Sequence, residues 1–496
     1  MPAHALTSLV DQPVYLALAL IIVTSTLIFT RLKFKSLSQY SQNKVPLVPP
    51  GSLGLPFIGE TIDFLRAQKL DKTHEWISER TAKYGSIFKT SLLGCPTVFM
   101  VSAIGNRFIF HSNDNSIMSH QPKTIGTILG NHNTSELSGN LHKLMRRAMS
   151  SFLGPEMLRN YVGEMHLLVK QQLFLELEGK ETVKAVMLLK RLAFRVTCTL
   201  LFAIPPGSEQ DLLLEDFTTA LRGFLTLPFN LPMTPFRRAI RARKRICNRL
   251  SDLIRKKRKE VMEGRVSLKD DIISSFVNLR DENGEDIGDD VLIDNLFTLM
   301  IASHDTIVIL LSLLLRLIAR NHVVRNGIIE EQQAILKERE GVEDGNLTWS
   351  DLQKMKYTWS VAQELMRLNP PVSGTFKKIV KDTSFGGFDI PKGWQVFWLA
   401  SVTHTEKNSF PDPERFDPSR FMGPSKSFPP FSYIPFGAGP HICPGNEFAR
   451  VEVLLVLHHL IVNYRWSEMV PDEPITRNPL PYPAKGLPIK LHRLEK

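Results

Sequence analysis

The chain has 496 residues, of which 43% are hydrophobic and 22% are charged, a balance typical of a globular protein and not of a disordered one. Its formal net charge is +11, and such a basic excess suits nucleic acid, an anionic membrane surface or an acidic partner protein. Because the sequence has neither zinc-finger spacing nor an aromatic RNA-binding motif, we expect no nucleic-acid partner.

An uncharged, mostly apolar segment lies near the start of the chain. It covers residues 14–30, and these 17 residues are close to the shortest stretch that spans a bilayer. Arg31, Lys33 and Lys35 follow it, whereas no small-residue cleavage site does. Because positive charge keeps its side of a span in the cytoplasm, we expect residues 1–44 to form an uncleaved single-pass anchor and not a secretory signal peptide. The body of the protein would then face the cytosol.

The next segment, residues 45–59, is rich in proline and glycine. This composition gives a stiff, extended linker, which would space the anchor from a globular body over residues 60–496. In that body, apolar residues recur at helical spacing in the segments 212–225, 291–319 and 450–462. Strand patterns are shorter and fewer, at 86–94, 97–102 and 395–401. The body is therefore predicted to be mainly α-helical with a minor β part.

Residues 228–258 form an apolar stretch that is broken by prolines and leads into a strongly basic helix. A helix of this composition can be an ordinary solvated surface helix. It can also lie on a membrane, with the apolar tip inserted and the basic helix over the lipid headgroups. The sequence leaves both interpretations open.

The segment PFGAGPHICPG, residues 435–445, surrounds one cysteine with glycines and prolines. Neither a helix nor a strand tolerates that composition in its interior. The four cysteines of the chain are far apart and form no CxxC pair, which argues against a disulfide framework or a structural zinc site. A lone thiolate suits haem, because the macrocycle brings the nitrogen ligands and the protein adds one axial sulfur. The glycines would expose backbone N–H donors to that sulfur.

Five residues of this loop resemble the haem-binding pattern of the cytochromes P-450, Phe-x-x-Gly-x-Arg-x-Cys-x-Gly. They are Phe436, Gly439, His441, Cys443 and Gly445. The resemblance implies the cytochrome P-450 fold from about residue 49 onward, with Cys443 as the axial ligand of the iron of haem b. The arginine that contacts a haem propionate in the family is His441 here, and the charge of a histidine depends on pH.

Two further segments resemble the structural triad of the family. Glu364 and Arg367 match its Glu-x-x-Arg pair, and residues at i and i+3 share a helix face on which they can form an ion pair. The second arginine comes from the segment PERFDPSRF, which offers Arg415 and Arg420. We prefer Arg420, because residues 416–421 fit the family pattern Phe-x-Pro-x-Arg-Phe. The resemblance implies that this triad supports the thiolate loop.

The segment IASHDTIVI lies in the predicted helix 291–319 and resembles the oxygen-activation motif of the family. By this resemblance, Thr306 would donate a hydrogen bond to bound dioxygen and Asp305 would relay protons towards it. Ser303 stands where the family usually has glycine, although a serine can bend a helix by bonding back to the preceding turn. Ile307 stands where the family usually has a second threonine.

Residues 139–153 resemble the family helix that reaches the haem propionates. Arg146 would take the place of the propionate-binding arginine, whose planar fork pairs well with carboxylates. His142 takes the place of the usual tryptophan. Lys377, in the segment GTFKK, would be a further propionate contact.

The segment PLPYPAKGLPIKL, residues 479–491, resembles a loop of one plant branch of the family, which oxidises sterols, triterpenoids and related isoprenoids. The implied function is that of a haem-thiolate monooxygenase in the endoplasmic reticulum membrane, which hydroxylates a hydrophobic isoprenoid with O₂. An NADPH-dependent cytochrome reductase would supply the electrons. The reductase, membrane lipid and the hydrophobic small molecule are then the expected partners, and we expect a monomer.

Two other functions remain open. A haem-thiolate isomerase or dehydratase needs no O₂, but such relatives usually lose the acid–threonine pair, which this chain keeps at Asp305 and Thr306. A non-catalytic membrane haem-binding protein would show no reductase-dependent oxygen uptake. A bulky apolar ligand suits the composition of the segments that would line the pocket: 113–133, 222–229, 299–303, 372–376 and 479–484.

Overall fold

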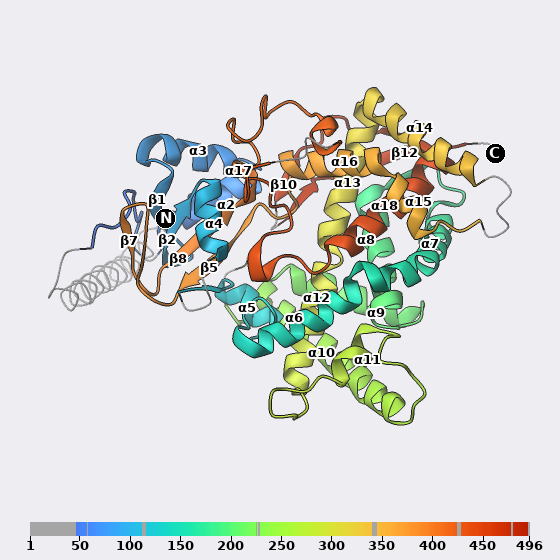
Figure 1. The fold of residues 1–496 in the computed structure, drawn as a ribbon, viewed down its shortest axis with the longest axis horizontal. Helices are drawn as coiled ribbons and strands as arrows, with labels where there is room; N and C mark the ends of the chain where they lie inside the picture. Colours follow the sequence, from blue (N-terminus) through green and yellow to red (C-terminus); the bar gives the residue numbers. More distant parts are fainter. Residues whose placement is uncertain are drawn as a thin grey trace, which may run out of the picture.

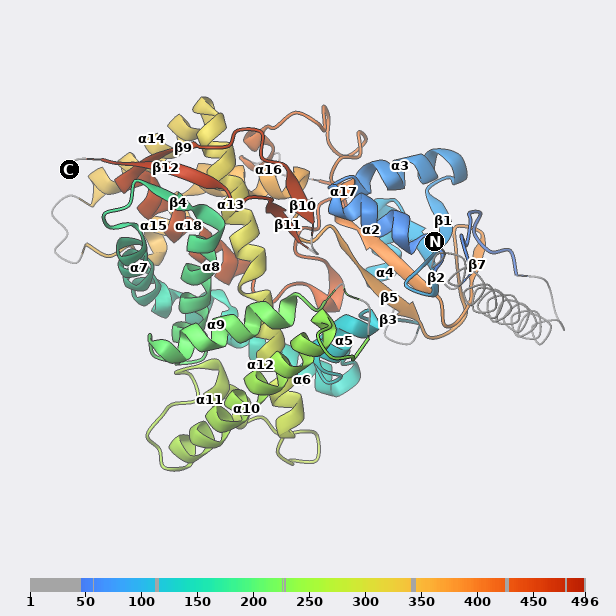
Figure 2. The same ribbon diagram turned by 180° about the vertical axis from the view of Figure 1, so that it is seen from behind.

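A computed structural model describes residues 46–56, 58–111, 116–224, 226, 229–339, 345–423, 428–477 and 480–494. The anchor predicted over residues 1–44 lies outside these described residues. The described chain is mainly helical with a smaller β part, so the predicted fold class is confirmed. Figures 1 and 2 show that the larger sheet and the first helices lie at one end of the molecule, while the longer helices fill the rest.

The largest sheet has five strands in the order β1-β2-β8-β5-β3. These strands are β1 (Ile87–Leu92), β2 (Cys95–Met100), β8 (Gln395–Leu399), β5 (Gly374–Ile379) and β3 (Ile117–Ser119). Only β2 and β8 pair in parallel. Alternate residues of the edge strand β1 are buried, whereas every residue of the central strand β8 is. The three strands predicted from the sequence are therefore confirmed.

Three smaller sheets join β4 to β12 and β9, β6 to β7, and β10 to β11. Their strands are β4 (Thr182–Lys184), β6 (Thr383–Phe385), β7 (Phe388–Ile390), β9 (Tyr464–Glu468), β10 (Ile475–Arg477), β11 (Pro481–Pro483) and β12 (Pro488–Arg493). The hairpin of β10 and β11 pairs Thr476 with Tyr482. It lies against helix α13, which places Tyr482 close to the candidate active site.

Helices make up most of the described chain. The first half contains α2 (Thr61–Lys69), α3 (Thr73–Tyr84), α4 (Ala103–His111), α5 (Lys123–Leu129), α6 (Gly139–Leu153), α7 (Pro155–Leu177), α8 (Ala185–Val196), a π-helical turn (Thr197–Leu201), α9 (Ser208–Leu221) and α10 (Pro235–Met262). The second half contains α11 (Ile272–Val277), α12 (Asp289–Ala302), α13 (Asp305–Arg320), α14 (His322–Glu338), α15 (Trp349–Lys354), α16 (Lys356–Leu368), α17 (Ala400–Thr403) and α18 (Asn446–Asn463), with 3₁₀ turns at Pro418–Phe421 and Gly439–His441.

Helix α18 runs through the centre of the helical part. Its residues between Phe448 and Ile461 are nearly all buried, and a helix that is apolar on all sides has to be covered on all sides. Helices α7, α13 and α14 provide that cover. Because α18 begins directly after the cysteine loop, the position of the loop is set by one of the most deeply buried elements of the fold.

The helix predicted over residues 291–319 is interrupted. α12 ends at Ala302 and α13 begins at Asp305, so the expectation of one continuous helix is wrong. Ser303 Oγ donates to the Leu299 carbonyl at 2.8 Å, and Thr306 Oγ1 donates to the Ala302 carbonyl at 2.9 Å. Hydroxyl groups that bond back to the preceding turn compete with the backbone ladder and bend a helix. The break therefore occurs at the serine that replaces the usual glycine.

The stretch from Asp289 to Arg320 is long and apolar enough to cross a membrane. Most of it is buried inside the protein, between α8, α10, α14, α16 and α18. It is the only such stretch in the part of the chain that the structure describes. Its apolar character is explained by its central position in the core.

The basic segment folds as helix α10, which forms the lower part of the molecule in Figure 1 together with α11. Its buried residues recur every three or four positions, at Phe236, Ala239, Ala242, Ile246, Leu250 and Ile254. Most of the arginines and lysines lie on the opposite, solvated face, whereas Arg243 and Lys257 turn inwards to Asp294 and Asp271. Just before the helix, the side chains of Phe229, Leu231 and Met233 are 57%, 60% and 91% exposed.

Candidate active site

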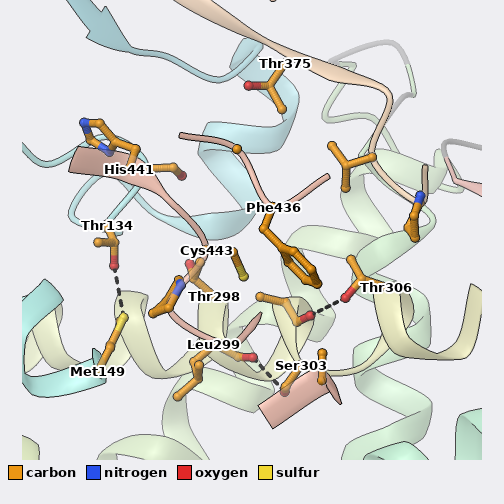
Figure 3. A pocket seen from close by; sticks show the side chains of 18 of the residues that line it. Thr134, Met149, Thr298, Leu299, Ser303, Thr306, Thr375, Phe436, His441 and Cys443 are labelled. Carbon is orange, nitrogen blue, oxygen red and sulfur yellow. Dashed lines mark hydrogen bonds between the residues drawn. The ribbon is translucent and has the colours of Figure 1, made fainter. Parts of the chain in front are cut away.

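A cavity of about 360 Å³ lies between the helix break and the cysteine loop. α6, α12, α13, β5 and residues 435–449 contribute to its lining, which is mostly apolar. Figure 3 shows side chains of α12 and α13 and side chains of the cysteine loop turned towards the same space. The apolar side chains include Met149, Leu153, Leu299, Ile307 and Leu310.

Glycines give the cysteine loop its tight path. Gly439 has a φ of +64°, and a Cβ there would lie 2.6 Å from the Phe110 carbonyl oxygen, so a larger residue would be both strained and excluded. The loop closes on itself where the Cys443 N–H donates to the Phe436 carbonyl at 2.8 Å. Helix α18 begins three residues after the cysteine, which leaves the sulfur little freedom to move.

The thiol of Cys443 lies at the surface of the cavity but is shielded from bulk solvent. Burial raises its pKa, and the Gly445 N–H and the nearby Arg146 guanidinium offset only part of this rise. Arg146, on α6, donates a hydrogen bond to the Ile442 carbonyl, next to the cysteine. The charge of Arg146 is therefore placed where it favours the thiolate.

Other nitrogen donors share this region with the sulfur. The rings of His142 (α6) and His441 have centroids 4.2 Å apart, and both line the cavity. Burial lowers the pKa of His441 to about 3, with contributions from Lys377, His142 and Arg146. Lys377, on β5, is buried and its Nζ lies 5.3 Å from the centre of the Phe110 ring.

This set of groups fits haem. Among the residues that the structure describes, no group of three or more His, Cys, Asp or Glu could hold a metal ion. A metal bound to Cys443 would thus need a macrocycle to complete its coordination, as haem iron does. Cys443 would then provide the axial sulfur, and Arg146, Lys377, His142 and His441 are the groups available to the two propionates.

The structure separates Asp305 from its neighbour Thr306. Thr306 lines the cavity, as Figure 3 shows, whereas Asp305 does not. Tyr482 Oη donates to Asp305 Oδ1 at 2.6 Å, and the same oxygen lies 3.2 Å from His304 Nδ1 and 3.7 Å from Lys190 Nζ. Burial alone would raise the pKa of Asp305, but these three neighbours outweigh it and hold the pKa below its usual value.

Sequence reasoning missed two residues outside the motif, Tyr482 and Lys190, that contact the carboxylate of Asp305. Tyr482 lies on β11 and Lys190 on α8, far from Asp305 along the chain. The segment PLPYPAKGLPIKL was assigned a resemblance to a plant branch and, over residues 479–484, a place in the pocket lining, but no contact with Asp305. No sequence signal assigns either residue to the acid, because only tertiary packing brings the three elements together.

The predicted triad residues come together beneath the loop. Arg367 Nε and Nη2 donate to the Glu364 carboxylate at 2.7 and 2.8 Å, and both residues are fully buried. Arg420 Nε lies 3.5 Å from Glu364 Oε1. Arg415 takes part only through its carbonyl, which accepts from Arg367 Nη2 at 3.2 Å. The geometry thus matches the choice of Arg420.

His404 connects this triad to the cysteine loop. Its carbonyl accepts from Arg367 Nη1 at 2.9 Å, and its Nε2 accepts from the Ile434 N–H at 2.8 Å. Burial lowers the pKa of His404 to about 3, so the ring is neutral and able to accept. Sequence reasoning missed His404, because a single histidine in a helical turn carries no recognisable pattern.

Two of the predicted pocket segments do not reach the cavity with any residue that the structure describes. Segments 299–303 and 372–376 contribute to the lining, and segment 113–133 does so through Ser119 and Gln121. The described residues of 222–229 and 479–484 do not. Phe224 packs into the core instead, and Tyr482 turns to Asp305. Composition alone could not distinguish a residue that lines the pocket from one that supports it.

Comparisons with known proteins agree with this geometry. The sequence matches the family model for cytochrome P450 over residues 49–494. It is 36% identical to a beta-amyrin 28-monooxygenase of Kalopanax septemlobus, across 96% of this chain and 97% of that protein. It is 35% identical to a taxane 10-beta-hydroxylase of Taxus cuspidata, across 92% of each chain. The structure of retinoic acid-bound cyanobacterial CYP120A1 is 30% identical, with a TM-score of 0.80 over 91% of this chain and 100% of that one.

Proposed function

Because the chain belongs to the cytochrome P450 family and is a cytochrome P450 monooxygenase, we propose that it hydroxylates a hydrophobic isoprenoid of the triterpenoid, sterol or diterpenoid class. The electrons would come from an NADPH-dependent cytochrome reductase. One observation carries the proposal: the thiol of Cys443 and the hydroxyl of Thr306 line a single, mostly apolar cavity. The named activities of the plant relatives, on beta-amyrin and on taxanes, support the substrate class.

The cofactor of this reaction would be haem b, which supplies the redox chemistry with O₂. Cys443 would bind its iron, and Arg146 would pair with a propionate as a planar fork. Lys377, His142 and His441 would provide the remaining donors. The apolar side chains around them exclude water from the reacting carbon, which strengthens every polar contact inside the site.

Protons would reach the site through the break between α12 and α13. Thr306 Oγ1 donates to the Ala302 carbonyl, and its lone pairs can accept a hydrogen bond from a water molecule. The donor role expected from the sequence would require the same proton to turn from this carbonyl towards the cavity. Asp305 would take protons from the side of Lys190, whose side chain is 24% exposed. The retained acid and threonine favour this reaction over that of an O₂-independent isomerase or dehydratase.

Membrane attachment would involve two regions. Residues 1–44 would form the single-pass anchor in the endoplasmic reticulum membrane. The exposed Phe229, Leu231 and Met233, which precede the basic helix α10, would form a second contact with lipid. The alternative that α10 is only a solvated helix is compatible with its buried apolar face, but it leaves these three exposed side chains unexplained.

A product screen tests the proposed function. The full chain is co-expressed with a plant reductase in yeast, panels of triterpene, sterol and diterpene scaffolds are supplied, and oxidised products are identified by mass spectrometry. We expect a mono-oxygenated product of one scaffold class. If no scaffold is oxidised although the ferrous–CO complex has the absorption of a thiolate-ligated haem, the substrate class is wrong.

A further inference from the structure

One end of the cavity is polar, and the roles given above do not use it. Gln121, Thr134 and Ser135 line the cavity there, and Thr134 bonds to Asn295 of α12. Asn295 precedes Thr306 by about three helical turns, which is roughly 16 Å along a helix. In Figure 3, Thr134 lies at the left of the cavity and Thr306 at the right, with Thr298 between them. The polar end is therefore far from the place of oxidation.

The hydrogen bonds around Thr134 determine what its hydroxyl can offer. Asn295 Nδ2 donates to the carbonyls of His132 and Val291 at 2.7 and 2.8 Å. Two carbonyl partners fix the orientation of this amide, so Asn295 Oδ1 is an acceptor. Thr134 Oγ1 is bonded to that oxygen and lies 3.7 Å from Met149 Sδ, the contact drawn in Figure 3. Neither partner can donate, and the amide oxygen is the stronger acceptor, so the single Thr134 proton goes to Asn295. With its proton committed, the Thr134 hydroxyl presents only lone pairs to the cavity.

The same argument applies to Ser135. Asn133 Nδ2 donates to the Gly130 carbonyl, and Asn133 Oδ1 accepts from the Ser135 N–H at 2.9 Å. This amide is also fixed, and Ser135 Oγ is bonded to the same Asn133 oxygen. The Ser135 hydroxyl therefore donates to Asn133 and, like Thr134, offers only lone pairs elsewhere. Two neighbouring residues thus form a pair of acceptors.

An acceptor pair requires a hydrogen-bond donor. It cannot bind a haem propionate, because a carboxylate has no proton to donate. A cationic ammonium group is disfavoured by the apolar lining and by the positive charges of Arg146 and Lys377 in the same cavity. Gln121 lines the same cavity, and its carboxamide carries N–H donors that suit the oxygen of an alcohol. Glu136 holds this segment close, because its carboxylate accepts from the Gln121 N–H at 2.6 Å.

We propose that Thr134 and Ser135 bind a hydroxyl group of the substrate, which is then an isoprenoid alcohol oxidised at a carbon remote from that hydroxyl. This inference rests on the proposed function and names its substrate more closely. The matched pair of acceptors would orient the scaffold, because an alcohol that donates at one end leaves the other end over the reactive part of the cavity.

The test measures binding to the full-length, haem-loaded protein in yeast microsomes. Each ligand is titrated, and its dissociation constant is taken from the shift in haem absorption when it enters the site. The probes are the alcohol that the product screen identifies, its O-methyl ether and the analogue that lacks the oxygen. For a triterpene these are β-amyrin, its methyl ether and the deoxy hydrocarbon. The ether keeps an acceptor but has no proton to donate.

We expect the alcohol to bind about tenfold more tightly than its ether to the unaltered protein. Ser135→Ala should lower this ratio to about three, because Thr134 is left as the single acceptor. The loop should stay in place, since the Asn133 oxygen keeps its bond from the residue 135 N–H. Ser135→Thr should restore the ratio. Thr375→Val is the matched control. The hydroxyl of Thr375 lines the same cavity and accepts from Trp398 Nε1 at 2.7 Å, which leaves its proton free to donate. An alcohol oxygen and an ether oxygen accept that proton alike, so the ratio should not change.

The outcomes separate the two proposals. If alcohol and ether bind equally, or if their ratio is the same in the unaltered protein and in Ser135→Ala, the hydroxyl-binding role is wrong while the isoprenoid function stands. The same holds if the deoxy hydrocarbon binds as tightly as the alcohol. If none of the isoprenoids binds or is oxidised, both the proposed function and the proposed alcohol-binding site are wrong.

Discussion

Individual side chains at the site are held in two different ways. Cys443 is positioned by its own loop, through backbone hydrogen bonds and glycines within a few residues of it. Asp305 is positioned by Tyr482 and Lys190, which come from distant elements. The first arrangement is local and can be recognised in the sequence, whereas the second depends on the packing of a hairpin and a helix against the helix break.

Removing the sulfur tests the ligand assignment. In Cys443→Ala, the ferrous–CO complex should lose the absorption typical of thiolate ligation, because none of the other three cysteines lines the cavity. The matched control is Cys247→Ser on α10, which should keep the normal spectrum. A thiolate-type band that persists in Cys443→Ala would contradict the assignment.

Removing the Tyr482 hydroxyl tests how Asp305 is held. In Tyr482→Phe, the carboxylate loses a hydrogen-bond donor, so the pKa of Asp305 should rise and the acid side of the pH–rate profile should move to higher pH. Loss of one such bond should lower product formed per NADPH by about three- to tenfold. The solvent isotope effect on turnover should also change.

A purely structural role for Tyr482 would instead predict a lower melting temperature without a shift of the pH profile. The binding of substrate and the thiolate-type CO spectrum should be unchanged in Tyr482→Phe, because Tyr482 does not line the cavity. The role of Tyr482 would be wrong if the pH profile keeps its position while the melting temperature drops.

At the scale of elements, the two faces of helix α6 have different roles. Its buried face carries His142, Met145 and Met149, and Arg146 reaches the cysteine loop. Its opposite face exposes Lys143 and Arg147, one turn apart. A helix that contacts the cofactor pocket on one face and presents positive charge on the other is suited to receive electrons from an acidic partner.

Neutralising this exposed face should weaken the reductase contact. In Lys143→Gln with Arg147→Gln, the concentration of reductase needed for half-maximal turnover should rise about three- to tenfold at low salt, and the difference should shrink as salt is added. Haem content should stay normal. Lys256→Gln with Lys259→Gln on α10 is the matched control and should have no effect. Equal reductase dependence in all variants would refute the prediction.

At the scale of the whole molecule, several histidines are buried in neutral form. Burial lowers the pKa of His404 to about 3, of His458 to about 4 and of His459 to about 2. The ordinary value of 6.5 applies to the unfolded chain. Below pH 6.5 the unfolded chain therefore binds more protons than the folded one, and stability is lost as the pH falls.

The predicted size of this effect is substantial. At pH 5 each such histidine should lower the free energy of unfolding by about 2 kcal/mol relative to pH 7.5. His459→Phe keeps an aromatic ring beside His166 but cannot take a proton, so its melting temperature should fall less steeply with acid. His492→Phe, at an exposed site, is the control. Parallel pH dependences of the unaltered protein and His459→Phe would contradict the assignment.

The sequence by itself determined the fold class, the cysteine loop and most of the residues that surround it. These features depend on local chemistry. Glycines and prolines prevent a regular helix or strand at the loop, and a helix that is apolar on all sides has to be buried. The five residues of the loop pattern are close together in the chain, so their spacing is visible without a structure. The i, i+3 pair of Glu364 and Arg367 is visible for the same reason.

Only the tertiary structure decided the rest. It showed that Asp305 turns away from the cavity and that His404 joins the triad to the loop. It also showed that the described residues of 222–229 and 479–484 do not line the pocket. The orientation of the Thr134 and Ser135 hydroxyls likewise depends on Asn295 and on the fixed amide of Asn133. These contacts join residues that are mostly far apart in the chain, and hydrogen-bond direction is set by the partner and not by residue type.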